Sequence, residues 1–229
     1  MLAVTDPLSA KIVAMMYLGD VVFAMSGALA AGRQRMDVVG FTLIGTITGI
    51  GGGTLRDVLL GRTVWWTQQP TELILCVAVS LVTFSFVPNS ITRQSWVNWC
   101  DAIGLAALSV VGCHIALSAG VPPVVGVFMG VLTATGGGVI RDVLTKTKPM
   151  ITDGQLYATA ALLGATCYAI LVHTAVTELI AELLAFLSCL LLRAAAIVFN
   201  IRMGPPGEFL RIGPSQTTNT KGENGESSD

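Results

Sequence analysis

The chain has 229 residues, of which 53% are hydrophobic and 12% are charged, and its formal net charge at pH 7 is −1. Soluble domains carry roughly a quarter of their residues as charged side chains, so this chain has too little polar surface to cover a water-soluble globule. Its net charge gives no support for binding to nucleic acid or another polyanion. The composition therefore predicts a protein that is surrounded by membrane lipid and has no nucleic-acid partner.

Neither the cysteines nor the histidines form a pattern that is typical of a metal site. The residues concerned are Cys76, Cys100, Cys113, Cys167, Cys189, His114 and His173. No two cysteines have the Cys-x-x-Cys spacing, and the histidines lie far from any metal-ligand spacing. We interpret the cysteines as small hydrophobic side chains inside apolar runs. We therefore expect no metal site, no disulfide framework and no cofactor.

Seven apolar stretches follow one another, each near the length of about 20 residues that spans a bilayer. They cover about residues 9–31, 37–61, 70–87, 97–119, 122–146, 153–173 and 177–200. From Gly204 the sequence turns to Gly, Pro, Ser, Thr and Asn, which cannot bury enough apolar area to fold. The prediction is an all-α polytopic membrane protein with seven transmembrane helices and a disordered cytoplasmic tail at 203–229.

Lysine and arginine gather on one side of the predicted bundle. With seven spans, the loops at about 32–37, 88–96 and 147–152 share a face with the C-terminal tail. That face carries Arg33, Arg35, Arg93, Lys148, Arg202, Arg211 and Lys221, whereas the opposite face has little beyond Lys11 and Arg62. The positive-inside rule then predicts a multi-pass protein of the inner cell membrane with its N-terminus outside and its C-terminus in the cytoplasm.

The pattern Gly-Gly-Gly-x-x-Arg-Asp occurs twice, at residues 51–57 and 136–142. Upstream of each copy an aspartate, Asp20 or Asp101, opens a segment rich in small residues. Each repeat contains three spans, an odd number, so the second repeat enters the membrane from the opposite side. Inverted repeats of this kind are typical of transport proteins.

The repeat predicts four segments. They are a first three-helix repeat at 9–90, a second, inverted repeat at 97–175, a seventh transmembrane helix at 177–202 and the tail at 203–229.

The glycine triplets predict a break in the second and fifth helices. Three glycines in a helix cost roughly 2–3 kcal/mol relative to alanine, and unwound backbone at membrane depth is tolerated only where it lines a watery cavity or is buried in protein. Its freed carbonyl groups then face a cation, and the hydroxyls of Thr48 and Thr135 add to them. The glycines are Gly51, Gly52, Gly53, Gly136, Gly137 and Gly138.

An arginine and an aspartate follow each triplet by about one helical turn, as Arg56-Asp57 and Arg141-Asp142. Adjacent residues on a helix point about 100° apart, so we expect no pairing within either Arg-Asp dipeptide. We expect pairs across the two halves, or with the aspartates at the start of each repeat. Ionisable residues inside a membrane indicate a functional site by default.

A simpler alternative is that the glycines only allow two helices to cross closely, with the arginine and aspartate as interfacial anchors. The recurrence of triplet and Arg-Asp together weakens this alternative. The triplet is not a phosphate-binding loop of the Walker type, because the Gly-Lys-Ser/Thr ending is absent.

At these residues the sequence resembles the bacterial members of the trimeric intracellular cation channel family, which share a glycine-triplet (UPF0126-like) repeat domain. The similarity covers about residues 12–200, including Asp20, the segment Ser26-Gly27-Ala28 and both Gly-Gly-Gly-x-x-Arg-Asp motifs. The resemblance implies seven transmembrane helices, a homotrimer, and a hydrated, potassium-permeable pathway in each protomer between the inverted halves.

The resemblance also assigns roles to residues. It makes the six triplet glycines the kinking residues of the pore, and it places Arg56, Asp57, Arg141 and Asp142 near the pathway. Animal members carry a lysine directly before a triplet, but here Ile50 and Thr135 stand there. Any function of that lysine is therefore not expected in this chain.

Together these observations predict a passive channel for monovalent cations, K⁺ or Na⁺, and not an enzyme, because no nucleophile–base pair is visible. The pathway residues are expected to include the glycines, both Arg-Asp pairs, Asp20, Asp101, Ser26, Thr48 and Thr135. The alternative is a secondary transporter of a small zwitterion such as glycine, since a helix N-terminus suits a carboxylate and freed carbonyls suit an ammonium group. Some relatives of the repeat domain are described as glycine transporters.

Overall fold

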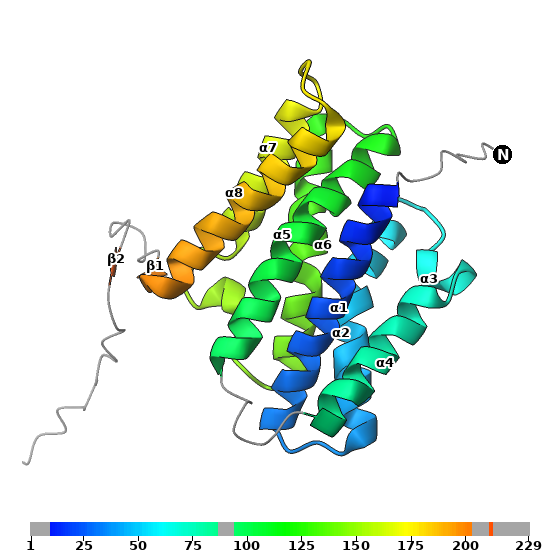
Figure 1. The fold of residues 1–229 in the computed structure, drawn as a ribbon, viewed down its shortest axis with the longest axis vertical. Coiled ribbons are helices and arrows are strands. Elements are labelled where there is room, and N and C mark those ends of the chain that lie inside the picture. The colour runs from blue at the N-terminus through cyan, green and yellow to red at the C-terminus, as the bar shows by residue number, and fades with distance from the viewer. Residues whose placement is uncertain (1–9, 87–93, 203–210, 213–229) are drawn as a thin grey trace, which may run out of the picture.

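The computed structural model describes residues 10–86, 94–202 and 211–212 of the chain, and these residues form a bundle of helices (Figure 1). The helices are α1 (Ala10–Arg33), α2 (Val38–Leu59), α3 (Trp65–Gln68), α4 (Thr71–Phe86), α5 (Gln94–Ser118), α6 (Pro123–Leu144), the 3₁₀ turn η1 (Met150–Thr152), α7 (Ala158–Leu171) and α8 (Glu178–Val198). Two short strands, β1 (Ile201–Arg202) and β2 (Arg211–Ile212), pair antiparallel after α8. The all-α class is confirmed.

Part of the sequence prediction falls outside the described residues. This is true of Arg93, of Lys221 and of the tail at 203–229 apart from β2.

Five helices of the described chain, α1, α2, α5, α6 and α8, are long and apolar enough to cross a membrane. Helices α4 and α7 are apolar too, but they have 16 and 14 residues, which give lengths of about 24 and 21 Å. The sixth predicted span, at 153–173, is shorter than expected because its first residues form the end of a turn rather than helix. Large apolar side chains such as Val39, Phe86 and Val124 lie exposed on the outside of the bundle, as lipid requires.

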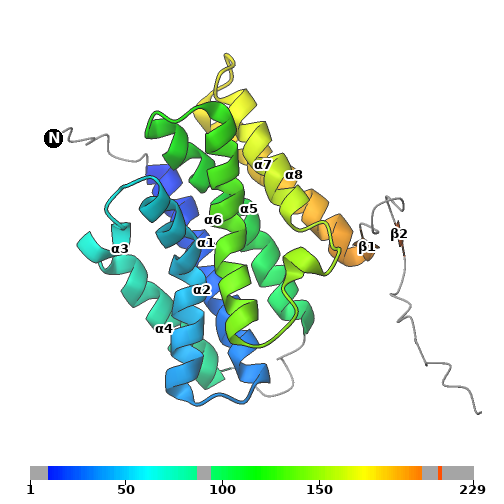
Figure 2. The same ribbon diagram turned by 180° about the vertical axis from the view of Figure 1, so that it is seen from behind.

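Two helices, α1 and α6, each pack against several others. Helix α1 packs against α2, α4 and α5, and helix α6 packs against α2, α5 and α7. Helix α8 covers the outside of α5 and α7 (Figure 1). Figure 2 shows α2 and α6 side by side and running in opposite directions at the centre of the fold.

Local sequence signals account for where the two central helices begin. The carboxylate of Asp37 accepts a hydrogen bond from the backbone N–H of Gly40 at 2.8 Å, which caps the start of α2. Helix α6 begins at Pro123, whose missing N–H costs nothing in the first turn.

The expected break at the glycine triplets is wrong. Both α2 and α6 continue as helix through their triplets to Leu59 and Leu144. An unbroken helix satisfies its own backbone hydrogen bonds, which an apolar medium strongly favours. The low helix propensity of the glycines is offset by the close packing of α2 against α6 that their missing side chains allow.

The glycine triplets are the place where α2 and α6 cross at close range. A β-carbon on Gly52 would overlap the carbonyl oxygen of Thr133, and a β-carbon on Gly137 would overlap that of Thr48. A β-carbon on Gly136 would lie 3.4 Å from the α-carbon of Gly52. The simpler of the two sequence interpretations, close helix crossing, therefore describes the triplets in this structure.

We predict that Gly52→Ala and Gly137→Ala each destabilise the protein, because the added methyl group would push apart two backbones. Overpacking of this kind costs about 1–3 kcal/mol or more. Gly53→Ala is the matched control: its β-carbon would meet only Nη2 of Arg56, at 3.7 Å. The thermal unfolding temperature of purified protein in detergent measures the difference. Equal unfolding temperatures for all three variants would contradict the close crossing.

Candidate functional site

The second Arg-Asp motif is the centre of a buried polar cluster. The Arg141 guanidinium is fully buried and donates from Nη1 to the carboxylate of Asp101 at 2.7 Å and to the hydroxyl of Ser26 at 2.6 Å. Its Nε donates to the carboxylate of Asp142 at 2.8 Å. Because Ser26 belongs to α1 and Arg141 to α6, this cluster joins the two halves of the molecule.

Two further groups complete this inner cluster. The second carboxylate oxygen of Asp142 accepts from the backbone N–H of Met150 at 3.0 Å, which holds the start of η1. The hydroxyl of Tyr157 donates to Asp101 Oδ1 at 3.4 Å. The other oxygen of Asp101, Oδ2, is buried and has no hydrogen-bond partner among the described residues.

The first Arg-Asp motif repeats part of this arrangement. Arg56 Nε donates to Asp57 Oδ1 at 2.9 Å, and Asp57 Oδ2 accepts from the backbone N–H of Trp65 at 3.3 Å. Trp65 and Met150 each lie eight residues after their aspartate, so the aspartate binds the same backbone position in both halves. The two motifs are therefore equivalent in structure as well as in sequence.

The expectation that no Arg-Asp dipeptide pairs with itself is wrong. Both adjacent pairs form, with closest N–O distances of 2.9 Å for Arg56–Asp57 and 2.8 Å for Arg141–Asp142. The long arginine side chain bends through the 100° that separates the two positions, because in an apolar medium a nearby carboxylate is the best available partner. The expected pair with the aspartate of the same repeat forms only in the second half, between Arg141 and Asp101.

The halves differ because their first helices differ. Arg141 is held by the hydroxyl of Ser26, but the residue in the corresponding register of α5 is Ala107, which offers Arg56 no oxygen. In the part of the chain that the structure describes, Arg56 makes an ion pair with Asp57 alone, and Asp20 makes none. The negative charge of the cluster around Arg56 is thus less fully neutralised than that of the cluster around Arg141.

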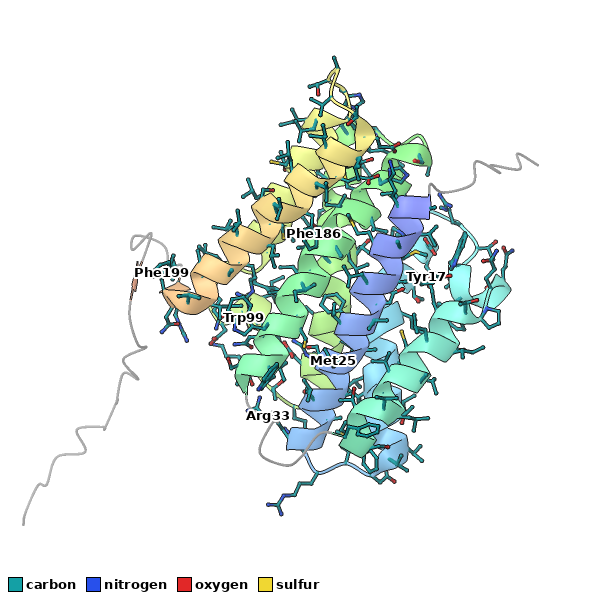
Figure 3. All side chains as sticks on the ribbon, in the orientation of Figure 1. Tyr17, Met25, Arg33, Trp99, Phe186 and Phe199 are labelled. Atoms are coloured by element: carbon teal, nitrogen blue, oxygen red, sulfur yellow. The ribbon has the colours of Figure 1, made fainter. Side chains whose placement is uncertain are left out.

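Each cluster borders a cavity. A cavity of about 10 Å³ is lined by Asp20, Gly53, Thr54, Arg56, Asp57 and Glu72, and also by Thr133 at the crossing. A larger cavity of about 440 Å³ opens at the other end and is lined by Arg33, Asp142, Lys148, Met150, Asp153 and Arg202. Arg33, labelled in Figure 3, ends α1 at this second mouth. The small cavity reaches the α2–α6 crossing at Thr133, whereas the larger one lies where α1, α6 and α8 end.

The threonines that precede the triplets use their hydroxyls within their own helix. Thr48 donates to the carbonyl of Ile44 at 2.6 Å, and Thr135 donates to the carbonyl of Val131 at 2.9 Å. Their oxygens remain acceptors, so the structure places them beside the crossing without giving them a cation-facing geometry.

Two polar residues of the clusters, Glu72 and Tyr157, were not singled out from the sequence. Glu72 borders the small cavity, and Tyr157 contacts Asp101. Arg193 of α8 is fully buried, donates to Gln155 at 3.0 Å and stacks over the ring of Tyr157. The signal that could have found the first two is register: Glu72 and Tyr157 both lie 15 residues after the aspartate of their motif.

A family model described as "Glycine transporter" matches the chain twice, over residues 13–88 and 98–173. The chain belongs to this family. Among its curated relatives, the UPF0126 inner membrane protein YadS of Escherichia coli K12 is 38% identical over 189 residues, covering 81% of this chain and 91% of the relative. A UPF0126 membrane protein of Vibrio cholerae is 36% identical over 187 residues, covering 81% of this chain and 78% of the relative.

Solved structures similar to this member of the family are channels. The trimeric intracellular cation channel (TRIC) orthologue from Rhodobacter sphaeroides is 39% identical with a TM-score of 0.80, over 84% of this chain and all of that one. A prokaryotic TRIC channel in 0.5 M KCl is 29% identical with a TM-score of 0.77, over 84% and 98% of the two chains. A structure described as explaining conductance through TRIC cation channels is 32% identical with a TM-score of 0.76, over 91% and 100%.

We predict that Arg141→Met destabilises the protein by about 3–5 kcal/mol, because it leaves two buried carboxylates without their cation. Arg56→Met should cost less, since among the described residues Arg56 makes an ion pair with one carboxylate. Thermal unfolding in detergent compares the two variants. Adding Asp101→Asn to Arg141→Met should recover part of the lost stability. A double variant no more stable than the single one would contradict the role of Arg141 as the cation that compensates Asp101.

Proposed function

We propose that the chain is a channel for monovalent cations, permeable to K⁺, with one pathway in each protomer between its two repeats. The observation that supports this most is the placement of the Arg-Asp clusters. Each borders a cavity: Asp57 lines the small one near the end of α2, and Asp142 lines the larger one near the end of α6, which runs in the opposite direction. Similarity to solved TRIC channels at up to 39% identity supports the same function.

The mechanism that we propose is electrostatic. Acidic side chains raise the occupancy of a cation inside the protein, and the adjacent arginines limit how tightly the cation is held. The Asp57 and Asp142 carboxylates are well suited to this, because each is oriented by a backbone N–H as well as by its arginine. The carbonyl groups of the crossing stay within helices, so they contribute less than unwound backbone would.

The fully buried Arg141 closes the pathway in this proposal. It contacts Asp142 and Met150, which line the larger cavity, from the buried side, and it also binds Asp101. A cation crossing between the cavities therefore requires that this arginine leaves at least one of its partners. Opening thus exchanges a contact between this buried arginine and a carboxylate for contacts of the arginine with water and of the freed carboxylate with water or the ion.

The orientation and assembly of the protein follow in the same proposal. Arg33, Lys148 and Arg202 line the larger cavity, Arg35 follows the end of α1 and Lys146 follows the end of α6, whereas Lys11 lies in the first turn of α1. The positive-inside rule then places the N-terminus outside and seven spans in the inner membrane, with α4 and α7 as the two shorter ones. The trimeric names of the solved relatives support a homotrimer.

A carrier of a small zwitterion such as glycine is the second candidate, and the description of the family model favours it. A carrier must expose one site alternately to the two sides, and the two cavities on either side of the crossing are compatible with that.

We expect purified protein in a planar bilayer under a KCl gradient to give discrete unitary currents that reverse near the K⁺ potential. The acidic side chains favour cations over Cl⁻, which sets the sign of that potential. Absence of currents, together with saturable glycine counterflow in liposomes made from the same preparation, would replace the channel by the carrier.

We predict that the double variant Asp57→Asn with Asp142→Asn lowers K⁺ conductance by roughly threefold or more and weakens cation selectivity, because two charges near the pathway are lost. Asparagine keeps an oxygen for the N–H groups of Trp65 and Met150. The control is Asp37→Asn, which removes an exposed charge and still caps α2. Conductance and reversal potential equal to wild type in the double variant would remove the aspartates from the mechanism.

A further inference from the structure

The small cavity at the first Arg-Asp motif contains a buried acid with a free oxygen. Glu72, in the first turn of α4, is 5% exposed and lines the cavity. Its Oε1 atom is buried and has no hydrogen-bond partner among the described residues. A buried carboxylate oxygen without a partner is costly unless something in the cavity binds it.

A second acid shares this cavity. Asp20 of α1 is also 5% exposed, and its charge repels that of Glu72 when both are ionised. Within the described chain, neither carboxylate makes a hydrogen bond or an ion pair. The remaining acid, Asp57, has both oxygens occupied, by Arg56 and by the backbone N–H of Trp65. Three acids thus face one arginine, and two of them have free oxygens.

The second half of the molecule lacks this excess of negative charge. Tyr157 stands in the register of Glu72, and its hydroxyl donates to Asp101 instead of adding a carboxylate. The third glycine of each triplet shows the same contrast. A β-carbon on Gly138 would lie 3.2 Å from Asp101 Oδ1, whereas on Gly53 it would meet only Arg56. The acids of the second half are thus better neutralised, and the first half keeps an acidic cavity.

We propose that the cavity between Asp20 and Glu72 is a binding site for a single monovalent cation, at the end of the pathway that lies opposite the larger cavity. This deepens the proposed channel function, on which it rests. The cavity volume of about 10 Å³ suits one particle of the size of a water molecule, such as a dehydrated K⁺ ion.

A divalent ion is a poor fit to this site. Calcium takes six to eight oxygen ligands, and magnesium demands an octahedron of them. In residues 10–86 and 94–202, no group of three or more His, Cys, Asp or Glu side chains is placed to hold a metal ion. Two carboxylates match a weakly held cation better than a tightly held one, and a permeant ion must also leave.

A water molecule and a shared proton are the competing occupants. Water would bind Glu72 Oε1 and the unpartnered indole N–H of Trp65, but it would leave the two acidic charges uncompensated. A proton shared between the two carboxyl groups would remove one charge without any cation. With either occupant, the thermal stability of the protein does not depend on which cation is present.

The test is the thermal unfolding of the purified full chain in detergent at fixed pH and ionic strength, in KCl, RbCl or N-methyl-D-glucamine chloride. At a K⁺ concentration about tenfold above Kd we expect the wild type to unfold about 3 °C higher than in the bulky organic cation. Glu72→Gln should abolish this difference, because the amide keeps the shape but loses the charge. Glu178→Gln, at a half-exposed site on α8, is the matched control and should keep it.

Asp20→Asn provides a second, independent variant, and it should also abolish the K⁺-dependent difference. A difference that persists in Glu72→Gln, or a wild type that responds to pH but not to the cation, would overturn the site. The outcome is separate from that of the channel proposal. If the planar bilayer shows no currents but the K⁺-dependent unfolding temperature depends on Glu72, the channel proposal fails and the cation site stands. If unitary currents occur without this K⁺ dependence, the channel proposal stands and the cation site fails.

Discussion

At the centre of the fold, the backbone carbonyls of Thr133 and Thr48 fill the space that side chains at Gly52 and Gly137 would need. Two helices can approach this closely only where both lack a β-carbon, and in lipid such van der Waals packing is what holds helices together. The threonines stand four residues before the glycines, so the contact repeats itself about a twofold relation. The crossing fixes the positions of α2 and α6, and with them the two Arg-Asp motifs that follow it.

Burial of the two motifs explains their chemistry. Arg141 is fully buried and Arg56 is 3% exposed, so each must be compensated at once by a carboxylate. The adjacent aspartate provides this in both halves, and its second oxygen then binds a backbone N–H eight residues further on. Each buried aspartate therefore connects its helix by a hydrogen bond to the segment that follows the helix. In the proposed channel, a permeating cation would pass these charges.

Duplication and divergence together produce an asymmetric molecule. Ser26 faces Arg141, but the equivalent residue Ala107 gives Arg56 no partner. Where one half has Tyr157 as a hydrogen-bond donor, the other has Glu72 as a further acid. These small differences leave one cluster neutralised and the other with an excess of carboxylates, although the backbone arrangement around the two aspartates is shared.

The sequence by itself determined the class of the protein, because a chain with apolar runs of membrane length and few charges is suited to a lipid bilayer. It also located the duplicated motif, and it indicated the link between Arg141 and Asp101. Only the tertiary structure decided that the triplets stay helical, since their cost is repaid by contacts between α2 and α6 that no local propensity contains. The same holds for the pairing of Arg56 with Asp57 and for the place of Glu72, because the nearest partner of a buried charge depends on which helices surround it.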